Sequence, residues 1–225
     1  MEKIIASRYL AKDFITLEAI KALRANLIFS GEEIQAVALT SFRPAEGKTT
    51  ISLHLAASLA QAGKRVLLLD ADLRKSSLAN RLHMRKKAQG LAHYLSGEAN
   101  VSDLLFSTDI PGLFIIFAGA QIPNAAEALG GKNFKKLIPA LKESFDYIIV
   151  DAAPVGQVID CAIIAPELDG VLMVIDATKN SYKMQRQVKN RLSKSGARIL
   201  GVILNRVDHK GYYGKAYDYS SSEKE

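Results

Sequence analysis

Six short runs of apolar residues recur along the chain, and longer stretches that mix polar and apolar positions separate them. The runs begin near Ala36, Val66, Leu113, Tyr147, Gly170 and Ile199. Apolar runs of this length are typical of strands buried on both faces, and intervening helices allow such strands to run parallel. The pattern therefore predicts an α/β fold, with a mostly parallel sheet that carries helices on both faces.

The two ends of the chain depart from this alternation. We predict an N-terminal helical arm in residues 1–35, one α/β domain in residues 36–207 and a flexible, tyrosine-rich tail in residues 208–225. Thr16 is the expected cap of the arm helix. Along that helix, one side is apolar and its flank is polar: the apolar positions are Leu17, Ile20, Leu23 and Leu27, and the polar ones are Glu18, Lys21 and Arg24.

A phosphate-binding loop is predicted between the first apolar run and the helix that follows it. Residues 44–50 read Pro-Ala-Glu-Gly-Lys-Thr-Thr, and we expect a helix from about Lys48 to Ala62, ended by Gly63. Backbone N–H groups at that helix N-terminus bind phosphate oxygens. The fold class is therefore that of a P-loop NTPase. The expected nucleotide-binding residues of this loop are Pro44, Ala45, Glu46, Gly47, Lys48, Thr49 and Thr50.

Within this loop, individual residues have separate expected roles. Lys48 would reach the β- and γ-phosphates of ATP, and the Thr49 hydroxyl would hold Mg²⁺. Phe42 stands where the usual pattern has its first glycine. A phenylalanine there predicts an ordinary negative φ, with its N–H still available.

Three aspartates are expected at the same edge of the sheet. Asp70 ends the second apolar run, Asp72 follows it, and Asp151 ends the run that begins at Tyr147. Ligand sites of open parallel sheets lie outside the carboxyl ends of the strands. Mg²⁺ prefers a few oxygen ligands and keeps waters in its other positions. These acids are therefore candidate ligands or bases at a Mg-nucleotide site.

Composition restricts where the protein acts. No apolar run approaches the ~20 residues of a membrane span, and the start shows no secretory segment. The single cysteine, Cys161, excludes an intrachain disulfide and suits a reducing compartment. We expect a cytoplasmic protein that a partner recruits to the inner face of the membrane. The net charge of +7 mostly indicates solvated basic faces, and no nucleic acid partner is expected.

The whole set of motifs resembles the bacterial tyrosine kinases (BY-kinases) of capsular and exopolysaccharide biosynthesis, in the form where the kinase is a separate cytoplasmic chain. The resemblance covers nearly the whole sequence. It is carried by residues 18–24, 44–50, 70–75, 90–91, 95–97, 151–154, 201–206 and the tyrosine tail.

The resemblance implies a non-specific protein-tyrosine kinase that uses ATP and Mg²⁺ and phosphorylates its own tail. Lys48, Asp70 and Asp72 would be catalytic, with Asp70 our candidate acceptor of the phenol proton, although the roles of the two aspartates could be exchanged. Thr49, Asp72 and Asp151 would hold the metal, and Asn205 would contact adenine. The implied phosphoacceptors are Tyr212, Tyr213, Tyr217 and Tyr219.

The resemblance also implies partners. Glu18, Lys21 and Arg24 correspond to an oligomerisation motif that implies a homo-oligomeric ring, in which each tail would enter the site of a neighbour. Lys21 replaces the usual arginine of this motif. Lysine lacks the planar fork that pairs two-pronged with a carboxylate. A membrane adaptor of the polysaccharide co-polymerase type would activate the kinase, and a tyrosine phosphatase would oppose it.

Other functions remain open for this sequence. A Tyr/Gly/Ser-rich end can be merely disordered, or it can dock on a partner. A partition-type P-loop ATPase switch shares this class of loop but usually carries an early lysine, where this chain has Arg43. A catalytically weak nucleotide-binding regulator is suggested by Phe42 and Lys21.

Overall fold

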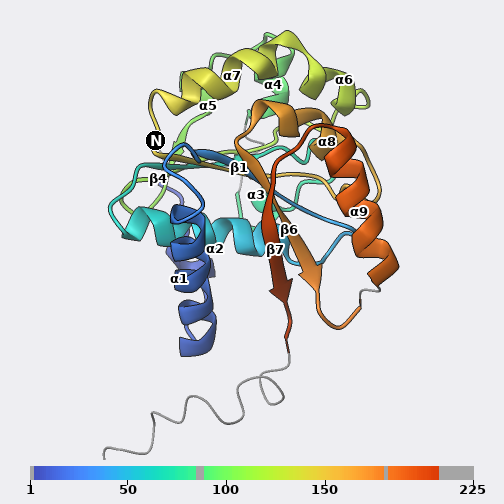
Figure 1. Ribbon diagram of the computed structural model, residues 1–225. Helices are drawn as coiled ribbons and strands as arrows, with labels where there is room; N and C mark the ends of the chain where they lie inside the picture. The colour runs from blue at the N-terminus through green and yellow to red at the C-terminus, as the bar shows by residue number, and fades with distance from the viewer. Residues whose placement is uncertain (1–2, 85–88, 180–181, 208–225) are drawn as a thin grey trace, which may run out of the picture.

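A single seven-stranded sheet forms the centre of the protein (Figure 1). The computed structural model describes residues 3–84, 89–179 and 182–207. Within this part of the chain, the strand order is β3-β4-β2-β5-β1-β6-β7, and all neighbouring strands are parallel except β3 and β4. The strands are β1 (Ala36–Ser41), β2 (Val66–Asp70), β3 (Phe106–Ser107), β4 (Leu113–Ile116), β5 (Tyr147–Asp151), β6 (Gly170–Asp176) and β7 (Ile199–Asn205).

The predicted mostly parallel sheet is confirmed, and six of its strands coincide with the six apolar runs. The sequence did not predict β3, which pairs antiparallel with β4 through Phe106 and Ser107. A strand of two residues is too short to show an alternating pattern in the sequence. β3 forms because it pairs with β4.

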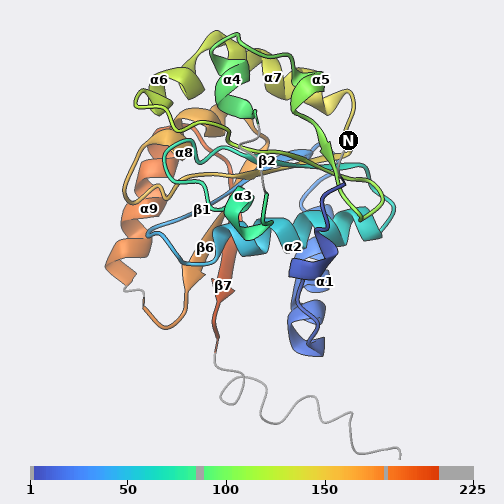
Figure 2. The same cartoon turned by 180° about the vertical axis from the view of Figure 1, so that it is seen from behind.

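The helices form one layer on each face of the sheet (Figure 1, Figure 2). One layer holds α1 (Phe14–Ile28), α2 (Lys48–Gln61) and α3 (Leu78–Arg81). The other holds α4 (Leu91–Leu95), α5 (Val101–Leu104), α6 (Ala125–Gly130), α7 (Lys132–Lys142), α8 (Asp160–Ile164) and α9 (Tyr182–Lys194). Short 3-10 turns span Ser7–Tyr9 and Ala165–Glu167. None of the described helices is long and apolar enough to cross a membrane.

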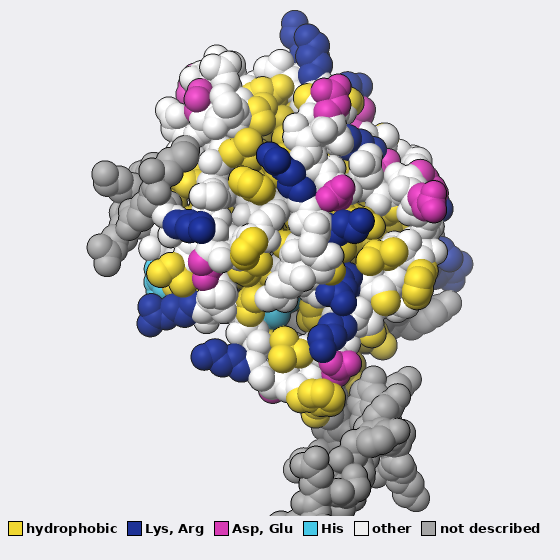
Figure 3. All heavy atoms as spheres, turned by 90° about the vertical axis from the view of Figure 1, so that its left-hand side faces the viewer, with side chains coloured by type: hydrophobic (Ala, Val, Ile, Leu, Met, Phe, Trp, Pro, Cys, Tyr) yellow, Lys and Arg dark blue, Asp and Glu magenta, His cyan; other side chains and the backbone are white. Residues whose placement is uncertain are grey.

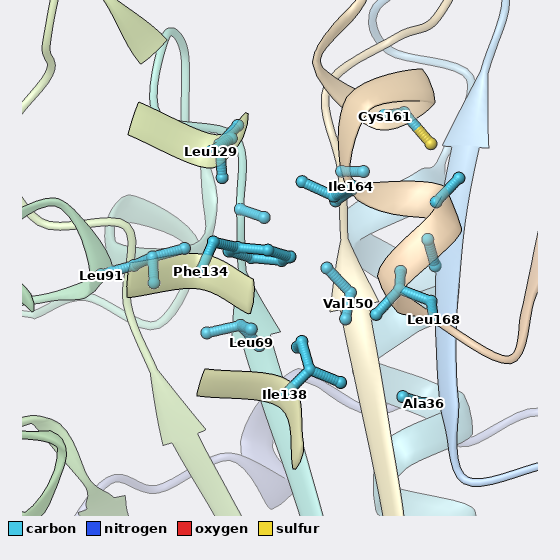
Figure 4. Packing of buried hydrophobic residues seen from close by; sticks show 14 of the residues in the cluster. Ala36, Leu69, Leu91, Leu129, Phe134, Ile138, Val150, Cys161, Ile164 and Leu168 are labelled. Atoms are coloured by element: carbon cyan, nitrogen blue, oxygen red, sulfur yellow. The ribbon is translucent and has the colours of Figure 1, made fainter. Parts of the chain in front are cut away.

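Side chains of each central strand alternate between two buried layers. In β1, Ala36 and Ala38 belong to the layer under α7 and α8, whereas Val37 and Leu39 belong to the layer under α2. Figure 4 shows the first layer, where Phe134 of α7 lies among side chains of β2, β5 and α8. Burial on both faces explains why these strands are continuous apolar runs.

Helix α1 packs along α2, but its first turn differs from our expectation. The Asp13 carboxylate accepts the Thr16 N–H at 2.8 Å, so Asp13 is the cap, and the prediction of Thr16 was wrong. Leu27 is buried, and Leu23 packs against the same layer. Leu17 is 39% exposed, so the apolar side does not extend to it. Ile20 and Leu23 are half-buried, so the predicted apolar side is covered from Ile20 onward.

Candidate functional site

The phosphate loop lies at the carboxyl ends of β1, β2 and β5 and leads directly into α2. Gly47 is the N-cap of α2, with φ 101°, and Ala45 has φ 62°. Two left-handed residues turn the backbone so that Lys48 opens the helix. Phe42 is not among the residues with positive φ, which confirms the expectation for it.

The Glu46 side chain ties the loop together. This residue is buried, and its Oε2 accepts the N–H groups of Phe42 at 3.0 Å and of Arg43 at 3.2 Å. The sequence suggested only a backbone role for Glu46. Its carboxylate fixes the first half of the loop through these two hydrogen bonds.

The end of β7 holds the loop from the other side. Asn205 Nδ2 donates to the Glu46 carbonyl at 2.9 Å, and Arg206 Nη2 donates to the Ala45 carbonyl at 3.0 Å. Arg206 is itself paired with the buried Asp176 at 2.5 Å. A Cβ added to Gly47 would lie 2.1 Å from Asn205 Nδ2 and would displace that side chain, and the φ of 101° also favours glycine.

Asp70 and Asp151 form a buried carboxylate pair at the loop. They are register partners in β2 and β5, with 0% and 3% of their surface exposed. Burial, together with the nearby Asp151, raises the pKa of Asp70 to about 8. Burial also raises the pKa of Asp151 to about 6, although Lys48 and a hydrogen bond from Thr49 act in the opposite direction. The Ser76 hydroxyl donates to Asp70 Oδ2.

Asp72 stands above this pair. Its N–H donates to Asp70 Oδ1 at 3.2 Å, and its own Oδ1 accepts the Lys75 N–H at 2.9 Å. Unlike Asp70, it lines an open cavity of about 620 Å³. The three predicted aspartates therefore meet at one edge, with one facing the cavity and two buried beneath.

The chemistry of this edge fits Mg²⁺ bound together with phosphate. The described residues contain no group of three or more His, Cys, Asp and Glu side chains that could hold a metal ion by themselves. Mg²⁺ needs only one or two protein oxygens when phosphates and waters supply the others. The Thr49 hydroxyl, which is hydrogen-bonded to Asp151, and the Asp151 carboxylate are hard oxygen donors, and the Lys48 cation lies near them.

The cavity brings most of the predicted loop residues together. Its lining includes Pro44, Ala45, Gly47, Lys48, Thr49 and Thr50. Arg74 also lines it, fixed by two hydrogen bonds to the buried Asp160 at 2.7 and 3.0 Å. A second cavity of about 770 Å³ contains Asn205 and shares Gly47 and Thr50 with the first.

The residues of the predicted oligomerisation motif have different surroundings. Glu18 and Lys21 form an exposed ion pair at 2.7 Å. Arg24 instead donates to the Ser58 carbonyl of α2 at 2.8 Å. The predicted phosphoacceptors Tyr212, Tyr213, Tyr217 and Tyr219 lie outside the described residues.

Sequence reasoning missed two ion pairs that shape the site. Arg74 was visible as the residue trailing the second acidic motif, but nothing marked Asp160, which is distant in sequence and comes close because β2 and β5 are neighbours. Asp176 ends β6, and Arg206 directly follows the neighbouring strand β7. Only the order of the strands reveals these partners.

Comparisons with known proteins agree with this geometry. Residues 34–200 match the family model of the AAA domain. Over 207 residues the chain is 41% identical to the tyrosine-protein kinase CpsD of Streptococcus agalactiae, covering 89% of this chain and 90% of that protein. The solved kinase domain of VpsO is 36% identical with a TM-score of 0.80, covering 85% of this chain and 94% of that one. The septum site-determining protein MinD of Pyrococcus horikoshii, complexed with Mg-ADP, has a TM-score of 0.66 at 23% identity over 78% of this chain and 72% of its own, a likeness of fold alone.

Proposed function

Because the chain belongs to the bacterial tyrosine kinases of capsule biosynthesis, we propose that it transfers the γ-phosphoryl group of ATP to tyrosines of its own C-terminal cluster. The observation that carries this proposal is the meeting of Lys48, Asp72 and the buried Asp70–Asp151 pair at one phosphate loop. Catalysis of phosphoryl transfer is mainly positioning and neutralisation of charge, and these groups supply both.

Each residue has a separate role in this proposal. Lys48 and the N-terminus of α2 neutralise the transferring phosphoryl group. Thr49 and Asp151 would hold Mg²⁺, and whichever of Asp70 and Asp72 does not take the phenol proton would be the further ligand. The ion would supply charge neutralisation at the phosphates. Asn205 contacts adenine from the second cavity, which it lines.

The exposure of the aspartates bears on the acceptor of the phenol proton. Asp70 was our candidate, with Asp72 as the exchanged alternative. Asp70 is fully buried, whereas Asp72 lines the cavity that an acceptor would enter. This difference supports Asp72 as the carboxylate that orients the hydroxyl and takes its proton. A phenol with a pKa near ~10 loses that proton late in the transfer.

We further propose transfer between subunits. Each tail would enter the site of a neighbour in a ring assembled through the Glu18, Lys21 and Arg24 segment. The exposed Glu18–Lys21 pair leaves this segment accessible to a second chain. A membrane adaptor would activate the kinase in the cytoplasm at the inner face of the membrane, a phosphatase would reverse it, and the cycle would regulate polysaccharide synthesis and export.

One assay tests the function. The full chain is incubated with Mg-ATP and the cytoplasmic segment of a co-polymerase adaptor, and phosphotyrosine is located by mass spectrometry. Phosphate on Tyr212 to Tyr219 supports the kinase. ATP hydrolysis without phosphotyrosine would instead support an ATPase switch, and neither activity would support a nucleotide-binding regulator.

Mixing two chains, each altered in a different part, tests transfer between subunits. One chain carries Lys48→Met and an intact tail, and the other has an intact site and phenylalanine at the four tail tyrosines. Neither can phosphorylate itself. Phosphate on the Lys48→Met chain is expected, and its absence would restrict transfer to a single chain.

A further inference from the structure

The two cavities meet at the phosphate loop. This arrangement determines which part of a bound nucleotide can lie in each cavity. Gly47 and Thr50 line both, and Asn205 lines only the second. A nucleotide with its base at Asn205 would pass its phosphates over Gly47 to reach Lys48. The remaining part of the first cavity, away from Asn205, is then left for the group that receives the phosphoryl.

This remaining part is basic. It is formed by Lys75, Asn80, Arg81 and Gln121, which line the same cavity as Lys48. Lys75 and Arg81 are exposed, and neither forms an ion pair with any acid in the described part of the chain. Arg74, which also lines this cavity, is by contrast paired with Asp160.

The charge balance of the cavity makes these two cations available for a ligand. Among the described residues that line it, Asp72 is the one acid. Lys48 is assigned to the nucleotide phosphates, and Arg74 is paired with Asp160. Lys75 and Arg81 therefore remain without an acidic partner in the described part of the chain. Arginine and lysine in this setting bind carboxylate or phosphate oxygens through charge-assisted hydrogen bonds.

We propose that Lys75 and Arg81 form an acceptor subsite that binds an anionic group next to the tyrosine being phosphorylated. This inference rests on the proposed kinase function and specifies its substrate. In the tail, Asp218 lies directly between Tyr217 and Tyr219, whereas no acid occurs within two residues of Tyr212 or Tyr213. Tyr217 and Tyr219 are therefore phosphorylated first.

The same subsite would accept a second source of negative charge. A phosphate placed on Tyr217 carries about −1.5 to −2 charges and three acceptor oxygens. It would lie two residues from Tyr219 and attract the same cations. The first transfer would then favour the second, so that the pair is phosphorylated in sequence.

The test uses one chain as the kinase that donates the phosphoryl group and another as the acceptor whose tail receives it. The acceptor is the full chain with Lys48→Met. The donor is the full chain with phenylalanine at all four tail tyrosines, alone or with Lys75→Ala and Arg81→Ala. Site-resolved mass spectrometry at early times measures the ratio of phosphate on Tyr217 and Tyr219 to that on Tyr212 and Tyr213.

We expect the unmodified donor to favour the Tyr217–Tyr219 pair about fivefold, the upper range for one exposed ion pair. The donor with Lys75→Ala and Arg81→Ala should lose this ratio while the rate at Tyr212 and Tyr213 stays unchanged. Lys136→Ala, at an exposed lysine of α7 outside both cavities, is the matched control and should keep the ratio.

Changes in the acceptor identify the source of the anion. When the acceptor carries Asp218→Asn, the first transfer should no longer favour Tyr217 and Tyr219. Using the Lys75→Ala and Arg81→Ala donor with this acceptor should lower the phosphorylation ratio no further. The preference for Tyr219 could instead survive Asp218→Asn and be lost with Tyr217→Phe. That result would identify the phosphate on Tyr217 as the group that the subsite binds. The single Arg81→Gln donor serves if the double variant does not fold.

The outcomes distinguish the subsite from the kinase. Phosphotyrosine in the same ratio with every donor would reject the subsite and leave the kinase intact. ATP consumption without any phosphotyrosine would reject the kinase function, and the subsite with it. An equal fall at all four tyrosines with the Lys75→Ala and Arg81→Ala donor would make these residues part of the phosphate site and also overturn the proposal.

Discussion

Replacing Asp70 by asparagine should stabilise the nucleotide-free protein, and the gain should grow with pH. The carboxyl is fully buried, and its pKa is raised from 3.8 to about 8 by burial and by Asp151. Between these two values the folded protein holds a proton that the unfolded chain releases. Folding therefore takes up a proton, so that stability is lost as pH rises through this window.

The size of the effect follows from the same two values. Each pH unit between them changes the free energy of unfolding by up to about 1.4 kcal/mol. At pH 7 the loss relative to acidic solution is on the order of 4 kcal/mol for the Asp70 carboxyl. Asparagine has no proton to take up, and its side-chain oxygen can still accept the Ser76 hydroxyl. Asp70→Asn should remove this slope.

Urea unfolding at pH 5, 6, 7 and 8 without nucleotide or Mg²⁺ measures the difference. The curves of wild type and Asp70→Asn should be closest at pH 5 and diverge towards pH 8. Asp103→Asn is the matched control, because Asp103 is an exposed aspartate away from the loop. Parallel curves for wild type and Asp70→Asn would refute the reasoning that this carboxyl is held protonated.

Three further changes probe the supports of the site. Arg74→Ala leaves the buried Asp160 without its cation and should lower the free energy of unfolding by about 2–3 kcal/mol, measured by urea unfolding. Asp13→Ala removes the cap of α1 and should cost about 1 kcal/mol in the same measurement; an unchanged midpoint would contradict the cap. His54 Nε2 accepts the Ala11 N–H at 2.7 Å, so His54→Leu should speed hydrogen exchange at that amide, and unaltered protection would show that another acceptor holds it.

The architecture was predictable because its signals are local. Strands buried on both faces are mainly apolar, which makes the runs of β1, β2, β5 and β6 visible in the sequence. The run of the edge strand β7 is equally visible, although its Val202 and Leu204 are exposed. The phosphate loop was equally legible, since Gly47 and Lys48 must stand in fixed order before the helix. Even the departure at Phe42 could be interpreted, because a side chain with a Cβ favours negative φ.

The supports of the loop were not predictable because they depend on tertiary neighbours. Arg206 follows β7 and reaches Ala45 only because the end of β7 comes to lie beside the phosphate loop. Arg24 was predicted on a polar flank, yet it turns towards Ser58 because α1 packs on α2. The N-cap of α1 was also predicted wrongly, because Asp13 and Thr16 are both good capping residues.

The buried acids show which part of the fold is arranged for chemistry rather than for stability. Asp160 is paired with Arg74, and hydrogen bonds from Thr178 and Arg206 lower the pKa of Asp176. These two acids have the partners that buried charges need. Asp70 accepts hydrogen bonds from the Ser76 hydroxyl and the Asp72 N–H, but no cation in the described part of the chain forms an ion pair with it. The charges that act on its pKa are those of the Asp151 and Asp72 carboxylates. A fold that pairs Asp160 and Asp176 with arginines but gives Asp70 no cation keeps a destabilising group where Mg²⁺ and phosphate would bind. Compensation by a ligand explains that cost.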